Sequence, residues 1–276
     1  MRKFLSLPAV ILLIVLLLPT GVEARAYTEV FHSGKIDWLK GTAEAVGIAI
    51  PARDAAKPGQ PKAKPAVEAE KAGRRNLLEL MGKLKIDSKT SMADLFSQSE
   101  SLKKQVQLLV QKVPVQRVRN RKDGGVEATL RIELSGALAE LLLPEDIRNI
   151  DSVQPKVQAE NAERAFSGLI VDCSGVRVRP AMSPRVFDED GQMVYGPPYI
   201  SREHAVKDGV ARYARDLATS KTEGRVASRP LTVKAIRTAH TGSSDVVISN
   251  ADAARVKAVA GNLRSLQRCR VLFVLD

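Results

Sequence analysis

Hydrophobic and polar residues alternate strictly over one stretch of the chain, residues 126–134. The apolar side of this alternation comprises Val126, Ala128, Leu130, Ile132 and Leu134. A period of two residues is typical of a β-strand with one buried face. Asp123-Gly124-Gly125 comes just before it, and these residues tolerate the backbone angles of a chain reversal. The pattern therefore predicts a β-hairpin within residues 113–134, with an apolar face that another layer must cover.

The apolar pattern upstream of the hairpin predicts that covering layer. Between residues 67 and 85 apolar side chains recur every three or four positions, as in an amphipathic helix. A second helix is predicted from about residue 91, with an interruption at residues 97–101. A strand pair at residues 27–32 and 36–40, an apolar stretch at residues 42–50 and a short helix at residues 136–143 complete the pattern. The order of elements predicts an antiparallel sheet with helices on one face, which is an α+β domain.

The chain is long enough for two such domains. We assign the N-terminal α+β domain to residues 25–145, with a loop rich in Pro, Ala and Lys at residues 51–65. The polar stretch at residues 146–165 is predicted to be a linker. Residues 166–276 are predicted to form a second α+β domain, with helices on a mixed sheet. Its predicted strands are 166–172, 176–178, 185–187, 193–195, 231–236, 245–248 and 270–275, and its predicted helices are 201–219 and 251–266.

The first 24 residues have the three parts of a secretory signal peptide. Arg2 and Lys3 form a positive start, residues 9–18 are an unbroken apolar run, and Val22-Glu23-Ala24 offers small residues for cleavage. The apolar run is short for a hydrocarbon layer about 30 Å thick, although an uncleaved membrane anchor is the alternative interpretation. No cysteine lies near the cleavage region, so no lipid attachment is expected there. We therefore expect a periplasmic protein with no transmembrane segment after cleavage.

The net positive charge of the chain indicates which class of partner it would bind. The net charge is +12, and it divides almost evenly between the two predicted domains. An even distribution favours general affinity for anionic surfaces, such as cell-wall polymer or lipid head groups. Nucleic acid is not an expected partner, because no aromatic residues interleave with the basic ones for base stacking and an exported protein meets little of it.

A series of short motifs in the N-terminal half resembles a known family. The motifs are Ile36-Asp37-Trp38-Leu39, Ala45-Val46-Gly47-Ile48-Ala49-Ile50-Pro51, the helix at residues 72–84, Ile86-Asp87-Ser88-Lys89-Thr90, and the hairpin. Over residues 25–143 the chain is similar to a family of bacterial envelope proteins. That family includes a membrane-associated lipoprotein and the N-terminal domain of the flagellar ring protein FlgT. The resemblance implies an envelope interaction domain without catalytic residues, and the chain lacks the lipidated cysteine of the lipoprotein members.

The densest basic cluster is the candidate contact site for an anion or a partner. It comprises Arg117, Arg119, Arg121 and Lys122, which we call the basic strip. The three arginines occupy alternate positions, so we expect them on one side of the hairpin. The alternative interpretation is a solvated sheet face or an edge guarded by charge.

Cys173 and Cys269 are the only cysteines, and they form a possible disulfide bond. We expect the first and last strands of the C-terminal domain to be neighbours, which would bring the two residues within reach. Two buried free thiols are the alternative.

No metal, cofactor or catalytic site is predicted. His32, His204 and His240 lack the spacing of zinc ligands, and the tract Asp188-Glu189-Asp190-Gly191 fits a charged hairpin turn better than a calcium loop. We therefore expect a non-catalytic interaction or structural protein of the cell envelope, with flagellar or other surface assembly as a candidate process. The alternatives are a periplasmic binder of an anionic polymer such as peptidoglycan, and an enzyme whose catalytic groups converge only in the folded chain.

Overall fold

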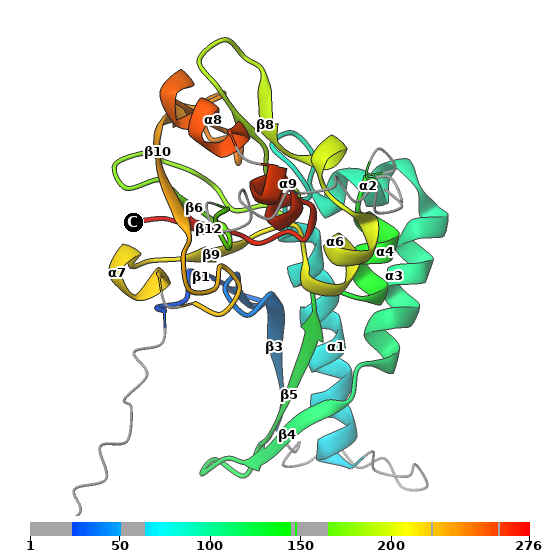
Figure 1. Cartoon of the computed structure of the whole chain (residues 1–276). Helices are drawn as coiled ribbons and strands as arrows, with labels where there is room; N and C mark the ends of the chain where they lie inside the picture. The colour runs from blue at the N-terminus through cyan, green and yellow to red at the C-terminus, as the bar shows by residue number, and fades with distance from the viewer. Residues whose placement is uncertain (1–23, 51–63, 145–146, 148–164, 222, 259) are drawn as a thin grey trace, which may run out of the picture.

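The computed structural model describes residues 24–50, 64–144, 147, 165–221, 223–258 and 260–276. The predicted signal segment up to residue 23, most of the predicted loop and nearly all of the predicted linker lie outside these residues. The described part has an α+β fold with two sheets, one antiparallel and one mixed (Figure 1). The predicted fold class is therefore confirmed.

The N-terminal sheet is antiparallel and has the strand order β1-β2-β3-β5-β4. Its strands are β1 (Thr28–Phe31), β2 (Gly34–Asp37), β3 (Thr42–Ala49), β4 (Val115–Asn120) and β5 (Val126–Glu133). The predicted hairpin is formed by β4 and β5. Its turn is closed by the amide of Arg121, which donates to the carbonyl of Gly125 at 2.8 Å, and Gly124 has a φ of +79°.

Helix α1 (Pro65–Lys83) covers the inner face of this sheet, and its Leu77 and Leu80 are fully buried. The helix approaches β3 closely where Gly73 faces Gly47. A Cβ atom on Gly47 would overlap the carbonyl oxygen of Ala69 and the amide nitrogen of Gly73. The absence of a side chain at residue 47 is therefore a condition for this packing.

Three shorter helices complete the N-terminal half: α2 (Met92–Gln98), α3 (Glu100–Lys112) and α4 (Ala137–Leu142). The predicted interruption between the first two is confirmed. Ser99 is both the last cap of α2 and the first cap of α3, where its hydroxyl accepts a hydrogen bond from the amide of Leu102 at 3.2 Å.

The C-terminal sheet is mixed and has the strand order β8-β7-β11-β10-β6-β12-β9. Its strands are β6 (Leu169–Asp172), β7 (Val186–Phe187), β8 (Met193–Tyr195), β9 (Arg212–Ala214), β10 (Leu231–Thr238), β11 (Val246–Ile248) and β12 (Val271–Val274). Strands β10, β6, β12 and β9 run parallel to one another, whereas β8 and β7, and β11 and β10, pair antiparallel. The predicted neighbourhood of the first and last strands is confirmed, because β6 pairs with β12.

The prediction of one helix over residues 201–219 is wrong. Helix α6 (Arg202–Asp208) ends at Gly209, whose φ of +77° suits a residue without a side chain. Strand β9 and the short helix α7 (Leu217–Ser220) follow. The apolar residues of this stretch are buried in either arrangement, so their spacing alone did not reveal the break.

Two other elements of this half also differ from the prediction. Residues 176–178 form no strand, and the predicted helix at residues 251–266 is divided into α8 (Asn250–Lys257) and α9 (Ala260–Gln267). A short 3-10 helix, Pro197–Tyr199, precedes α6.

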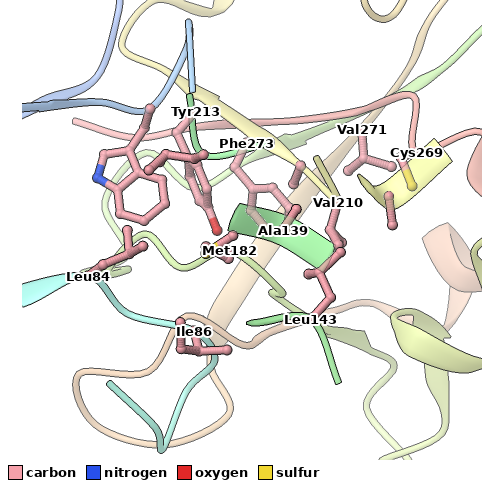
Figure 2. Packing of buried hydrophobic residues seen from close by; sticks show 14 of the residues in the cluster. Leu84, Ile86, Ala139, Leu143, Met182, Val210, Tyr213, Cys269, Val271 and Phe273 are labelled. Carbon is pink, nitrogen blue, oxygen red and sulfur yellow. The ribbon is translucent and has the colours of Figure 1, made fainter. Parts of the chain in front are cut away.

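The two sheets share one hydrophobic core. Figure 2 shows Leu84 and Ile86 from the N-terminal half in the same cluster as Met182, Tyr213 and Phe273 from the C-terminal half. Backbone hydrogen bonds also cross between the halves. The amides of Met182 and Ser183 donate to the carbonyls of Lys85 and Ile86, at 3.0 and 2.8 Å.

Trp38, the only tryptophan, lies at this junction and is 4% exposed. Its ring meets that of Tyr213 edge-on, with 5.5 Å between the ring centroids. Tyr213 in turn packs on Phe273 at 5.3 Å. Trp38 therefore packs against the other half of the chain and not only under its own hairpin.

Arg212 joins the halves at a second point. A Cβ atom on either Gly41 or Gly209 would overlap its guanidinium group, so that group packs directly on the backbone of both halves. Burial, followed by the nearby charge of Arg225, lowers the pKa of Arg212 to about 10.

Candidate functional site

The basic strip lies on β4, the outermost strand of the N-terminal sheet, and on the turn that follows. Arg117 and Arg119 stand opposite Thr129 and Glu127 of β5. These positions alternate with Leu130, which faces α1, so the two arginines belong to the sheet face away from the helix. The turn between β4 and β5 lies at the end of the molecule away from the C-terminal sheet (Figure 1).

Two members of the basic strip are paired with carboxylates. Arg119 contacts Glu127 at 2.9 Å, and Arg121 contacts Asp123 at 3.1 Å and Glu127 at 4.0 Å. Within the described part of the chain, Arg117 and Lys122 form no ion pair. These two residues therefore carry the positive charge of the strip that is free to meet a partner.

The same outer face continues across the sheet as a row of cross-strand ion pairs. Glu44 on β3 binds Lys35 at 3.1 Å on one side and Arg131 at 2.7 Å on the other. Partial burial would raise the pKa of Glu44, but the hydrogen bonds from Arg131 and Lys35 outweigh it and lower the pKa. In the described residues no strand pairs with the outer edge of β4, and charged side chains protect this edge from indiscriminate pairing.

The possible disulfide bond between Cys173 and Cys269 is not formed, and both residues are buried free thiols, which was the alternative interpretation. Strands β6 and β12 are neighbours, as expected, but they are parallel, with Leu169 opposite Val271 and Asp172 opposite Val274. Cys173 follows the end of β6, while Cys269 precedes the start of β12. The two residues thus lie at opposite ends of the strand pair, well beyond the Cα separation of about 4.4 to 6.8 Å that a disulfide needs.

We expect neither thiol to react with Ellman's reagent in the native protein, and both to react after unfolding. Burial raises the pKa of Cys269 to about 12 and raises that of Cys173 as well, so neither forms the reactive thiolate at neutral pH. The single variants Cys173→Ser and Cys269→Ser show which of the two thiols gives each reaction with the reagent. Rapid labelling of the native protein at either position would contradict the burial seen here.

The C-terminal half contains a polar cavity that the sequence analysis did not predict. Its volume is about 340 Å³, and it is lined by His204, Asp208, Gly224, Arg225, Arg268, Cys269 and Arg270. The lining residues come from α6, from the segment before β10, and from the turn between α9 and β12. They are far apart in the chain, and the density of arginine after residue 263 is the only sequence signal that pointed to them.

Arg225 forms the rigid wall of this cavity. Its guanidinium donates to the carbonyls of Val271 at 3.0 Å, Asp208 at 2.8 Å and Gly209 at 2.5 Å. Burial lowers its pKa, while Cys269, Asp208 and other neighbours oppose the shift. These three bonds use three of the five N–H groups of the guanidinium, which leaves two.

The turn that ends α9 presents Arg268 and Arg270. The amide of Cys269 donates to the carbonyl of Leu266 at 2.8 Å, and that of Arg270 to Ser265 at 3.1 Å, which is a Schellman arrangement. Cys269 takes the left-handed position of this turn, with a φ of +55°, where glycine is usual. Its side chain is fully buried in the core (Figure 2), whereas Arg268 is exposed and Arg270 is half-buried.

The remaining candidate chemistry of the sequence has structural explanations in the described residues. Asp188 closes a hairpin turn, where its carboxylate accepts from the amide of Gln192 at 2.7 Å and pairs with Lys257 at 3.3 Å. No group of three or more His, Cys, Asp or Glu residues is placed to hold a metal ion in the described ranges. Among the helices described, none has both the length and the apolar character to cross a bilayer.

Comparison with known proteins adds one relation. A family model described as Treponema pallidum Tp0624, second domain, matches residues 168–276. The seven-stranded half of the chain is similar to that domain. No curated protein matches the chain. The resemblance of residues 25–143 to the envelope family stays a prediction, because the matched range does not reach them.

Proposed function

We propose that the protein is an exported, non-catalytic component of the bacterial cell envelope that docks onto other molecules through its N-terminal sheet. The observation that carries this proposal is the basic strip on β4, whose outer edge pairs with no strand among the described residues. It combines an open backbone edge with an outer face of charged residues. Two of its cations, Arg117 and Lys122, have no carboxylate partner in the part of the chain that the structure describes. Edges and charged faces of this kind suit contact with an extended or anionic partner.

The predicted signal peptide supports a location in the cell envelope, and the family resemblance supports a role in surface assembly. The predicted signal peptide leads out of the cytoplasm, and residues 25–143 resemble envelope proteins that include a flagellar ring component. Flagellar or other surface assembly is the process that this resemblance favours. The partner would then be an envelope protein with a complementary acidic surface.

The double variant Arg117→Glu/Lys122→Glu tests this proposal. At about 1 kcal/mol for each basic residue at an anionic surface, the loss of two such contacts should weaken binding to isolated envelopes roughly 30-fold. Stability should change little, because neither side chain forms an ion pair in the described structure. Co-sedimentation with envelope fractions, at low and at high salt, measures the effect.

A matched control changes the same charge on another surface. Arg75 on α1 and Lys104 on α3 are exposed, so Arg75→Glu/Lys104→Glu alters the net charge equally. Equal loss of binding in both double variants would indicate a net-charge effect and contradict a docking role for the strip. Wild-type binding by the strip variant would also remove the strip from the proposal.

The second candidate function is a binder of an anionic polymer such as peptidoglycan, and the charge of the strip supports it equally. Binding to purified cell wall in the absence of protein, with steep weakening by salt, would favour the polymer. Crosslinking in intact cells that captures one envelope protein through the hairpin would favour docking. Turnover of a substrate that a single replacement abolishes would overturn both.

A further inference from the structure

We propose that the cavity between α6, Arg225 and the turn after α9 is a binding site for a phosphate dianion. The cavity presents three guanidinium groups and one carboxylate, a net charge of +2 with His204 neutral. The carboxylate is that of Asp208, whose Oδ2 lies 3.6 Å from Nδ1 of His204. Within the described residues, the side chains of Arg268 and Arg270 have no hydrogen bond or ion pair, so their donors are available to a ligand.

The charge of the cavity selects the class of anion. A single carboxylate, or the phosphate of a diester, carries one negative charge. It would balance only half of the net charge of +2 in the cavity. A phosphate monoester carries close to two negative charges at neutral pH, and it offers three oxygens to planar guanidinium donors. The volume of about 340 Å³ is at the lower end of the range for small-molecule sites, about 300 to 1,000 Å³.

The backbone holds the cationic groups apart and in place before a ligand arrives. Arg225 is fixed by carbonyls on two different segments, Asp208–Gly209 and Val271. The turn at residues 265–270 fixes the chain on both sides of Cys269. Because three guanidinium groups and one carboxylate line the cavity, a bound dianion would balance the excess positive charge and stabilise the folded protein.

Calorimetric titration of the purified protein with inorganic phosphate, at constant ionic strength, tests the site. We expect saturable binding of one phosphate and a rise in melting temperature with phosphate concentration. Arg268→Ala and Arg270→Ala should each weaken binding about tenfold or more, as expected for the loss of a charge-assisted hydrogen bond. Both side chains are at least partly exposed and form no hydrogen bond or ion pair within the described ranges, so both variants should remain folded.

Arg264→Ala is the matched control, because this exposed residue lies one turn earlier on α9 and does not line the cavity. Titrations with glycerol phosphate, a phosphodiester and acetate show which class of anion the site binds. Glycerol phosphate, a monoester, should bind as tightly as inorganic phosphate. Absence of saturation, or equal weakening by Arg264→Ala, would overturn the site. Binding of acetate or the diester as tightly as phosphate would overturn the assignment to a dianion. The basic strip is far from this cavity in the sequence, so failure here leaves the proposed function untouched.

Discussion

Replacing Gly47 with alanine should lower the free energy of unfolding by about 3 kcal/mol, near the upper end for overpacked sites. The added methyl group would overlap backbone atoms of Ala69 and Gly73 on α1, and backbone cannot move aside as a side chain can. The helix must therefore shift away from β3 along its length, which loosens the layer that covers the sheet. Urea denaturation followed by circular dichroism measures the loss.

Two glycines on the facing helix, α1, serve as controls with smaller expected effects. A Cβ atom at Gly73 would meet the end of the Leu130 side chain, which can adjust, so Gly73→Ala should cost less than Gly47→Ala. At Gly82 nothing lies within 4 Å, and alanine there should stabilise the helix by about 0.5 to 1 kcal/mol. A Gly47→Ala variant as stable as wild type would show that the helix does not pack on the strand as described.

Replacing Trp38 with alanine should cost about 3 to 5 kcal/mol, because the indole is almost fully buried between the two halves. The change opens a cavity beside Tyr213 and also removes the indole N–H that donates to Glu29 at 2.7 Å. In the wild type, the single tryptophan makes fluorescence a direct report on this junction, and its emission should shift to the red only as the shared core unfolds.

The variant Trp38→Phe separates the contribution of apolar packing from that of the hydrogen bond to Glu29. Phenylalanine retains most of the apolar contact with Tyr213 but donates no hydrogen bond, so the expected loss is nearer 1 to 2 kcal/mol. A Trp38→Ala variant within 1 kcal/mol of wild type in a urea titration would contradict the packing between the halves.

The N-terminal half could be predicted from the sequence because its patterns are local. The alternation from Val126 to Leu134 fixes one face of a strand, and Gly124 marks the turn before it. Amphipathic periodicity over residues 67–85 identifies the helix that covers the sheet. What the sequence did not show is the reason for Gly73: it looks like a weak point of a helix, and it proves to be the point of closest approach to a strand.

The C-terminal half was harder because its decisive features are not local. Strand direction has no signature in a short apolar run, so the neighbourhood of β6 and β12 could be predicted but not their parallel orientation. That orientation alone separates Cys173 from Cys269. Similarly, the stretch before Tyr213 has the spacing of a helix, and only Gly209 indicated that the helix ends there.

The candidate sites differ in the same way. The basic strip is contiguous and was visible in the sequence, although the partners that neutralise Arg119 and Arg121 appear only in the folded hairpin. The proposed phosphate site combines residues from three distant segments, and no motif links His204, Arg225 and Arg268.

The first described residues of the chain pair with a strand that is synthesised much later. Ala26 forms a bridge with Ala214, and the amide of Tyr27 donates to the carbonyl of Tyr213 at 3.3 Å. Contacts between such remote positions raise the contact order and slow folding, since loop closure must precede the gain from contact. The bridge from Ala26 therefore cannot form until residue 214 has been synthesised. For a protein exported as proposed, such late pairing would keep the chain accessible to a chaperone until its last strands are made.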